Sequence, residues 1–570
     1  MQVIVRRLIS RHWPLWIALA ALWIATGILQ YLAAARTEGH LIYTLDDSYI
    51  HMAMAKNIAQ HGVYGVTQYE FSSTSSSPVW TIILALSYAI VGVRDSIPFV
   101  LDLVISSVVL VIAYVLLERS VRRRSVVMFA LLAIVFFTPL PLLISTGMEH
   151  PLHIVLAILF LSLSATSMLD ESPGMKTSTL LTIFVVCAVL VMTRFESYAL
   201  VAVVSILFVL RGRWKTAAGV VLASVLPLII YQAISVAHGW HWLPNSILLR
   251  ANLQETKLFD SLESFLVIPW MSQGSGKFYT VGWDALQRTP YLLVLIGTPF
   301  VVLVASMMRT REFWKYNHMM LVALIAVAVA QMLFGRVGHL FRYEAHLIAL
   351  AVFALTFSVE DLFDTLMLWM SKSRIHAAAG SVVVLIAIQW TIPLFTRSFL
   401  ALPVLPRASQ NIYQQQYQMG LFLQRYYGGK TIAANDIGAI CYLADIRLVD
   451  LAGLATWDIY QLKKTHQLTP DRLQRLCDGK GVSIAVAYEI WLNLGGMSES
   501  RRRWKLLGRW TIPENIMCGS DVVSFLSVKS SEERRLQENL RNFSKELPRG
   551  VASWVRPDDP PDTQVTSGDP

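Results

Sequence analysis

Long apolar runs separated by short polar connections fill the first 396 residues of the chain. A helix needs about 17–25 mostly apolar residues to cross a bilayer. Nine runs predict single spans and a tenth, 178–210, is long enough for two spans broken at residues 193–196, which makes eleven. The nine are 14–34, 98–117, 125–144, 151–169, 216–236, 290–308, 317–335, 346–364 and 376–396.

One further apolar run, Val79 to Val93, is marginal in length, and whether it crosses decides the side of every later connection. If it lies at the outer membrane surface as a juxtamembrane helix, four basic clusters fall in the cytoplasm, as the positive-inside rule requires. We therefore predict a cytoplasmic amino terminus and an outer carboxyl terminus. The clusters are Arg119/Arg122/Arg123/Arg124, Arg211/Arg213/Lys215, Arg309/Arg311/Lys315 and Lys372/Arg374.

The first apolar run also has the features of a membrane anchor. Arg6, Arg7 and Arg11 precede it, as they would in a signal peptide. The apolar region of a signal peptide is shorter, roughly 7–15 residues. An uncleaved first helix is therefore favoured over a cleaved signal peptide.

The pattern changes after residue 397. Residues 407–427 predict an amphipathic helix, and the segments 430–440 and 446–454 predict a strand, a helix and a second strand. Further strands are expected at 482–488, 506–511 and 521–528. We predict an all-α polytopic membrane protein, with about eleven spans and a juxtamembrane helix, followed by an extracytoplasmic α/β domain. The expected parts are a membrane domain 1–396 with outer loops 35–97 and 237–289, an α/β domain 397–530, and a charged, disordered tail 531–570.

Composition supports this class. Of 570 residues, 55% are hydrophobic and only 15% are charged, which excludes an ordinary soluble protein. The net charge of +10 comes from basic clusters beside the apolar runs, so it indicates membrane topology and no nucleic-acid partner. The four cysteines allow one disulfide bridge and imply none. The membrane is expected to be the cell (inner or plasma) membrane.

The predicted topology places the unusual polar segments on the outer face. This distribution favours a reaction centre there over a transporter or lipid flippase of cell-envelope precursors, in which polar residues would extend through the membrane midplane. A sensor with a ligand-binding α/β domain would not need eleven spans. The outer polar segments are 46–77, 145–150, 194–196, 237–289, 335–344 and the region after 397.

Two adjacent carboxylates, Asp46 and Asp47, lie in the loop that follows the first span. Apolar residues at helical spacing come next, then a Ser/Thr run from Ser72 to Ser77, and then Pro78-Val79-Trp80. Charged groups at the edge of the hydrocarbon are costly, so acids in this position are functional candidates.

This stretch resembles the first outer-loop motif of the GT-C glycosyltransferases, integral-membrane enzymes that use polyprenyl-phosphate sugars. The resemblance covers most of the chain and is nearest to the protein mannosyltransferases and the mycobacterial arabinofuranosyltransferases. Phe195 departs from the pattern, since many relatives have Pro there. The matching segments are Leu45–Ile50, Gly147-Met148-Glu149, Thr193–Glu196, Pro244-Asn245-Ser246, Asn435–Ala439 and Asp450–Leu454.

The resemblance implies transfer of a sugar, with inversion, from a polyprenyl-phosphate donor to a hydroxyl of a glycan, lipid or protein acceptor. Asp46 matches the first acid of the family and is the expected general base; the alternative is a helix N-cap. Asp47 would orient Asp46, bind sugar hydroxyls or hold a divalent metal. His51 shares its helical face, but two ligands are too few to define a metal site, and a polar face turned to water is the simpler interpretation. No cofactor is certain.

The remaining candidates would bind acceptor or donor phosphate. Glu149 would contact acceptor or metal, with a capping role as the alternative. Arg194 is the first candidate for the phosphate, because a guanidinium group offers a planar fork of donors. For Arg336 and Arg342 the alternative is snorkelling to lipid headgroups. Further candidates are His339, Asn245, Arg250 and Lys257, and Trp240 and Trp242 suit either sugar contact or an interfacial belt.

Overall fold

The computed structural model describes residues 10–170, 176–242, 245, 290–334, 338–490 and 503–557. The chain divides into two compact units. The membrane unit comprises Met1–Thr44, Ile58–Gln60 and Ser73–Ser409. The α/β unit comprises Leu45–Asn57, His61–Ser72 and Gln410–Pro570, so the stretch that begins with Asp46 belongs to it.

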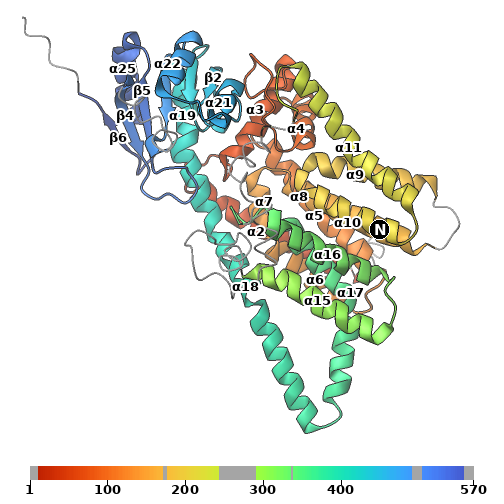
Figure 1. The fold of residues 1–570 in the computed structure, drawn as a ribbon. Coiled ribbons are helices and arrows are strands. Elements are labelled where there is room, and N and C mark those ends of the chain that lie inside the picture. Colours follow the sequence, from red (N-terminus) through yellow and green to blue (C-terminus); the bar gives the residue numbers. More distant parts are fainter. Residues whose placement is uncertain are drawn as a thin grey trace, which may run out of the picture. The chain divides into compact units, whose positions relative to one another are not determined.

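The membrane unit is built from helices (Figure 1). Among the described residues, eight helices are long and apolar enough to cross a membrane, or nine if the bent pair α6 and α7 forms one span. The predicted polytopic helical fold is confirmed. In chain order the helices are α2 (Trp13–Ala34), α4 (Pro78–Val91), α5 (Ile97–Glu118), α6 (Arg124–Phe137), α7 (Leu140–Thr146), α8 (His150–Leu169), α9 (Thr177–Thr193), η1 (Phe195–Ser197), α10 (Tyr198–Leu210), α11 (Trp214–Ala237), α15 (Tyr291–Thr310), α16 (Tyr316–Phe334), α17 (Ala345–Met370) and α18 (Arg374–Ile412).

The predicted count of eleven includes two shorter helices, α9 and Phe195–Leu210, which lie in the run expected to hold two spans. Helix α4 occupies the marginal run and has 14 residues. At about 1.5 Å per residue it falls short of the roughly 30 Å hydrocarbon layer. The sequence explains the break between α6 and α7, because Pro139 has no backbone N–H to continue the helix.

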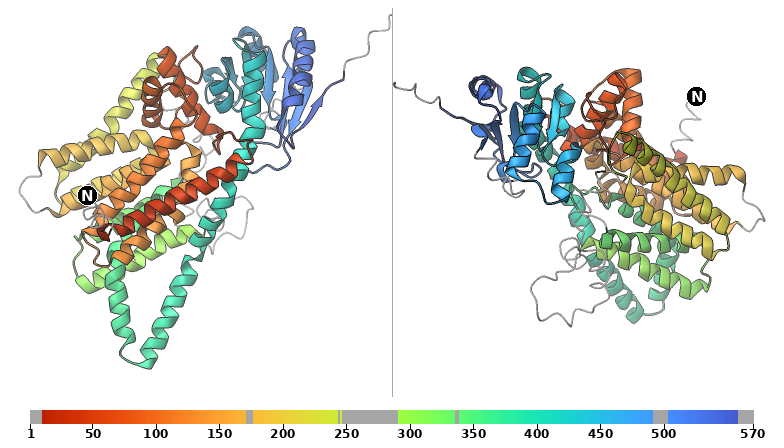
Figure 2. Two further views of the ribbon diagram at one scale, coloured as in Figure 1. Left: turned by 180° about the vertical axis from the view of Figure 1, so that it is seen from behind. Right: turned by 45° about the horizontal axis from the view of Figure 1, so that its top comes forward.

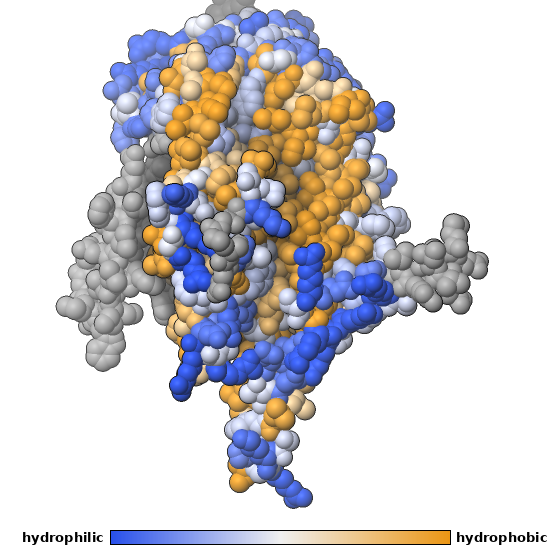
Figure 3. All heavy atoms as spheres, turned by 90° about the vertical axis from the view of Figure 1, so that its right-hand side faces the viewer, coloured by the Kyte–Doolittle hydropathy of each residue, from blue (hydrophilic) through white to orange (hydrophobic). Residues whose placement is uncertain are grey.

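The outer surfaces of the spanning helices are apolar. Helix α11 exposes Leu222, Leu226, Ile229 and Ile230, as a helix in contact with lipid does. Figure 3 shows a broad hydrophobic surface on the face drawn, bordered by hydrophilic residues. Helices α17 and α18 are joined by residues 371–373 and diverge as a V (Figures 1 and 2).

The α/β unit contains a six-stranded sheet in the order β2-β1-β3-β5-β4-β6. Strands β2, β1 and β3 are parallel, whereas β5, β4 and β6 continue the sheet in antiparallel fashion. The elements of the unit are α3 (Asp46–His61), η2 (Tyr413–Tyr417), α19 (Gln418–Tyr426), β1 (Thr431–Ala434), α20 (Gly438–Leu443), β2 (Arg447–Asp450), α21 (Trp457–Lys464), α22 (Pro470–Gly479), β3 (Ile484–Ala487), β4 (Lys505–Thr511), β5 (Val522–Ser527), η3 (Ser530–Glu532), α25 (Glu533–Phe543), η4 (Ser544–Glu546) and β6 (Ala552–Val555).

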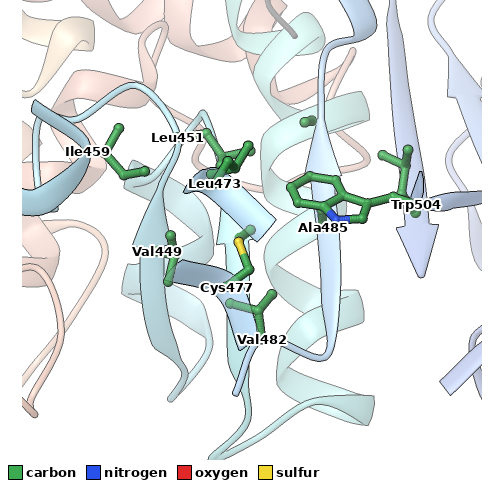
Figure 4. Close-up of a cluster of buried hydrophobic side chains, with 11 residues drawn as sticks. Val449, Leu451, Ile459, Leu473, Cys477, Val482, Ala485 and Trp504 are labelled. Carbon is green, nitrogen blue, oxygen red and sulfur yellow. The ribbon is translucent and has the colours of Figure 1, made fainter. Parts of the chain in front are cut away.

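Hydrophobic side chains cover the sheet in two clusters. In the first, Ile459 of α21 and Leu473 and Cys477 of α22 pack with strand residues and with Trp504 (Figure 4). The second is aromatic and centres on Phe422 of α19, whose ring lies 5.3–5.6 Å from those of Trp510, Phe525 and Phe543. Buried apolar area of this kind is the main source of folding free energy for a small domain.

The prediction of a disordered tail at 531–570 is wrong for residues 531–557. Residues 531–557 are ordered: α25 packs on β4, and β6 pairs with β4 from Gly508↔Val555 to Thr511↔Ala552. The high charge of the segment concealed an apolar stripe at Leu536, Leu540 and Phe543, all of which are buried. Residues 558–570 lie outside the described part. The α/β unit also begins at Gln410 instead of 397, because α18 continues unbroken to Ile412.

Candidate active site

Asp46 is the first residue of α3, and its carboxyl group is held by two backbone donors. The N–H of Gly438 donates to Oδ2 and the N–H of Ala439 donates to Oδ1, both at 2.8 Å. The approach is so close that a Cβ atom added to Gly438 would lie 2.0 Å from the Asp46 carbonyl oxygen. A glycine is therefore required at 438, which explains one position of the motif that the sequence analysis singled out.

A second carboxyl group, that of Asp436, lies in the loop that supplies these donors. Its Oδ2 accepts hydrogen bonds from the Tyr488 hydroxyl at 2.5 Å and from Gln416 Nε2 at 2.8 Å. Tyr488 is in turn held through its backbone N–H, which donates to Asn435 Oδ1 at 2.9 Å. Tyr488 and Gln416 are almost completely buried, so the position of Asp436 is set by three segments of the unit.

The sheet topology brings these residues together. Strand β1 lies between β2 and β3, so the chain leaves β1 toward one side and later returns on the other. In parallel α/β sheets, ligands bind at such a switch point, outside the carboxyl ends of the strands. Asp436 follows β1 and Tyr488 follows β3 directly. The carboxyl group of Asp46 therefore occupies, within its own unit, the position where this architecture ordinarily holds a ligand.

The charge state of Asp46 reflects this environment. Burial, followed by the nearby carboxyl group of Asp436, raises the pKa of Asp46 to about 7, against the opposing effect of the two backbone N–H donors. Burial also raises the pKa of Asp436, while the hydrogen bonds from Tyr488 and Gln416 lower it. A carboxyl group that ionises near neutral pH suits a general base.

The first three turns of α3, up to Asn57, belong to the α/β unit and are anchored in it. Lys56 Nζ donates to the Tyr442 carbonyl oxygen, and the rings of Tyr49 and Tyr442 lie 5.9 Å apart. Asp47 is partly exposed and contributes to the raised pKa of Asp46, whereas His51 is buried. No group of three or more His, Cys, Asp or Glu side chains in the described ranges could hold a metal ion.

In the membrane unit, Glu149 and Arg194 form a buried ion pair at 2.7 Å. Arg194 also forms a two-pronged pair with Glu196, from Nη2 at 2.6 Å and from Nε at 3.1 Å. The guanidinium charge thus faces two carboxylates. This arrangement brings together two predicted site residues that are 45 positions apart, and it makes Arg194 a poorer candidate for binding a further anion than the sequence indicated.

The loop that contains Glu149 is fixed by packing. Gly147 ends α7 with a positive φ of 62°, and an added Cβ would lie 2.6 Å from the ring of Tyr43. The indole N–H of Trp80 donates to the Gly147 carbonyl oxygen at 3.2 Å. Glu149 stands at the N-cap of α8 but makes no side-chain capping bond. The capping alternative for Glu149 is therefore wrong, and its carboxyl group pairs with Arg194 instead.

Tyr343 joins two cations of the membrane unit. Its ring centroid lies 5.6 Å from the guanidinium carbon of Arg194 and 5.0 Å from that of Arg342. Arg342 is only 2% exposed and donates to Met148 Sδ at 2.8 Å and to the Tyr343 hydroxyl at 3.3 Å. At this burial the Arg342 side chain does not snorkel. His339 is exposed and stacks on Tyr343, with ring centroids 5.9 Å apart.

Two buried groups of the membrane unit were missed from the sequence. Arg397 pairs with Glu344 at 2.8 Å and donates to the carbonyl oxygens of Phe137 and Phe341. Asp102 of α5 is completely buried near Glu149, and neither of its oxygens has a hydrogen-bond partner among the described residues. Asp102 lies inside the apolar run 98–117 and Arg397 directly follows the run 376–396, where single polar positions give little signal.

The remaining candidates belong mostly to segments outside the described part. Arg250, Arg336 and Lys257 fall there, with most of the outer loop 237–289. Asn245 is described and is buried. All four cysteines are free.

The chain matches one protein-family model and several solved structures. No curated protein matches the chain. A family described as a domain of unknown function (DUF8728) matches residues 410–526, which lie in the α/β unit.

Among solved structures, the archaeal oligosaccharyltransferase AglB from Archaeoglobus fulgidus, in complex with an inhibitory peptide and a dolichol-phosphate, is 12% identical, with a TM-score of 0.48 over 92% of this chain and 75% of that one. ArnT from Cupriavidus metallidurans, bound to undecaprenyl phosphate, is 11% identical, with a TM-score of 0.49 over 90% of this chain and 98% of that one. The apo state of ArnT is also similar, at 12% identity and a TM-score of 0.48 over 90% and 98%. The present chain is, by its own helices, a multi-pass membrane protein.

Proposed function

We propose that this protein is a membrane glycosyltransferase that moves a sugar from a polyprenyl-phosphate donor to an acceptor hydroxyl, with Asp46 as general base. The observation that supports it most is the state of Asp46: a partly exposed carboxyl group in the first loop after α2, with a pKa raised to about 7 by burial and by Asp436. The predicted topology places this chemistry at the outer face of the cell membrane, with the amino terminus in the cytoplasm.

The proposed reaction needs one base and one place for a leaving phosphate. The acceptor oxygen forms a bond to the anomeric carbon while the bond from that carbon to the phosphate oxygen breaks. The bonding electrons leave with the polyprenyl phosphate, and the hydroxyl proton goes to the Asp46 carboxylate. Attack from the face opposite the leaving group inverts the anomeric centre. A positioned base of this kind contributes roughly 10²- to 10⁴-fold to a rate.

For the departing phosphate we propose Arg342 in preference to Arg194. The Arg342 guanidinium group donates to the Met148 thioether and to the Tyr343 phenol, and it is buried where solvent screens charge weakly. Arg194 faces two carboxylates, so its charge is already compensated. Its proposed role is to hold Glu149 and, through Tyr343, the segment that contains Arg342.

The test measures release of polyprenyl phosphate from a panel of radiolabelled polyprenyl-phosphate sugars by the purified protein in nanodiscs, with and without added membrane acceptors. Asp46→Asn should lower turnover by roughly 10²- to 10⁴-fold. Asp471→Asn, which changes an exposed acid on α22, is the matched control and should leave turnover unchanged. Full turnover by a folded Asp46→Asn protein would eliminate Asp46 as the base. No release from any donor by the unmodified protein would eliminate the function.

A further inference from the structure

We propose that, within the α/β unit, the 436–439 loop holds the Asp46 carboxyl group and Asp436 acts as a positioning residue for it. This inference deepens the proposed function and rests on it. The sequence motifs gave Asp436 no role of its own. The assignment comes from contacts between residues almost 400 positions apart that lie in the same unit.

One short loop exerts two opposite influences on Asp46. The N–H groups of Gly438 and Ala439 bond to both carboxyl oxygens and so favour the ionised form. The carboxyl group of Asp436, two residues before Gly438, disfavours the same form by like-charge repulsion. Because both influences come from one loop, its conformation sets the orientation of Asp46 and also the pH at which Asp46 accepts a proton.

Asp436 cannot turn away from this arrangement without breaking buried hydrogen bonds. Its Oδ2 is held by Tyr488, which directly follows β3, and by Gln416, which lies in η2 before α19. The Tyr488 hydroxyl also contacts Gln415 Oε1 at 2.7 Å, and Gln416 Oε1 accepts from the Cys518 thiol at 3.3 Å. Both donors favour the charged form of Asp436. The network therefore fixes the carboxyl group of Asp436 in one place.

The other titratable groups that face Asp46 do not compete in this role. Burial raises the pKa values of the Cys441 and Cys518 thiols and of the Tyr488 hydroxyl, so all three remain neutral near pH 7. Lys56 lies near Cys441 and has a pKa lowered by burial. Asp47 repels Asp46 as Asp436 does, but more weakly. Asp436 is thus the main charged neighbour through which the pH response can be changed.

The sign of the expected effect follows from this charge. Removing Asp436 relieves the repulsion, so Asp46 should ionise at a lower pH and become a weaker base. The acid limb of the pH–rate profile should move to lower pH by about one unit, and the plateau rate should fall several-fold, as expected when a base weakens. The effect should fall mainly on kcat, because Asp436 acts through Asp46 and makes no proposed contact with donor.

The experiment titrates the Asp46 carboxyl group directly, by ¹³C-aspartate NMR of the full chain in nanodiscs with EDTA present and with Asp46→Asn for assignment. In Asp436→Asn the midpoint should fall by about one pH unit, and Asp436→Glu should restore part of it. Tyr488→Phe, which removes only a hydroxyl, should lower the midpoint by less. The Asp471→Asn control should leave it unchanged.

A midpoint that is the same in Asp436→Asn and the unmodified protein would overturn the inference. If Asp436→Asn fails to fold, an unchanged midpoint in Tyr488→Phe does so. The titration needs no turnover, so its result stands apart from the proposed function. A lowered midpoint without any transferase activity would eliminate the function and keep the coupling between the two carboxyl groups. Activity with an unchanged midpoint would do the reverse.

Discussion

The two polar clusters of this protein differ in how their charges are paired. In the α/β unit, Asp46 and Asp436 repel each other and are held by backbone N–H, phenol and amide donors. In the membrane unit, Arg194 is matched by Glu149 and Glu196, and Arg397 by Glu344. A balanced ion pair in a buried position fixes structure, whereas an unbalanced carboxyl group held by neutral donors can keep or release a proton near neutral pH.

Because of this difference, we expect the two clusters to affect different properties of the protein. Breaking a buried pair leaves an uncompensated charge and is costly, so the membrane cluster resists change of any kind. In the acidic cluster, two carboxyl groups already repel each other. Removing one of them should therefore change the pKa of the other, with little effect on the free energy of unfolding. Substitutions in the first cluster should therefore act on stability, and substitutions in the second on the pH dependence of the reaction.

The largest effect on stability is expected from Arg194→Met. It leaves Glu149, whose side chain is 0% exposed, without its ionic partner, and should lower the free energy of unfolding by about 3–5 kcal/mol. Glu149→Gln should cost less, because Arg194 keeps Glu196. The double variant should recover part of the loss. Unfolding by SDS in mixed micelles measures all three.

The exposed pair Arg425 and Glu546 provides the control. Both side chains are about half exposed at 47% and 53%, so Arg425→Met should change the free energy of unfolding far less than Arg194→Met does. Equal losses in Arg194→Met and Arg425→Met would contradict the structural role given to the membrane cluster.

A smaller effect is expected where the loop at Gly438 packs against Asp46. In Gly438→Ala the new Cβ would lie 2.0 Å from the Asp46 carbonyl oxygen, so α3 or the loop must shift, at about 1–3 kcal/mol. The same shift should weaken the hydrogen bonds to Asp46 and lower turnover. The matched control is Gly479→Ala, because no atom lies within 4 Å of a Cβ at that helical position. Similar stability and turnover in the two variants would show that the close approach at Gly438 does not exist.

The sequence predicted the individual residues of both clusters better than the contacts between them, because those contacts join distant positions in the chain. Asp46 and Asp47 were found because a pair of acids in the loop after an apolar span is a local signal. The Glu149–Arg194 pair was predicted only as two separate residues, since nothing local links positions 149 and 194. Asp436 was visible as part of a motif, but its role depends on contact with Asp46, which no periodicity encodes.

The fold, too, was predictable where it depends on local patterns and was missed where it depends on non-local contacts. Spans and strands depend on local hydrophobic patterns. The polytopic helical class was predicted from those patterns, while eight of the described helices, or nine with the bent pair, are long and apolar enough to cross a membrane, against eleven predicted. The segment 531–557 was taken as disordered because its high charge outweighed its three buried apolar positions. Its place in the sheet depends on pairing with β4, a non-local contact.

The smallest effect concerns Asp102, which shares features of both clusters. It lies in the membrane unit near Glu149, yet neither of its oxygens has a hydrogen-bond partner in the part of the chain that the structure describes. A buried polar group in this state lowers stability, so Asp102→Leu should raise the free energy of unfolding by about 1 kcal/mol. Ser106→Ala, one turn further along the same face of α5, removes another such group without a change of charge and is the control. A clear loss of stability in Asp102→Leu would mean that the carboxyl group has a partner in the membrane. Asp102 would then belong with the membrane cluster, as a fourth acid beside Glu149, Glu196 and Glu344.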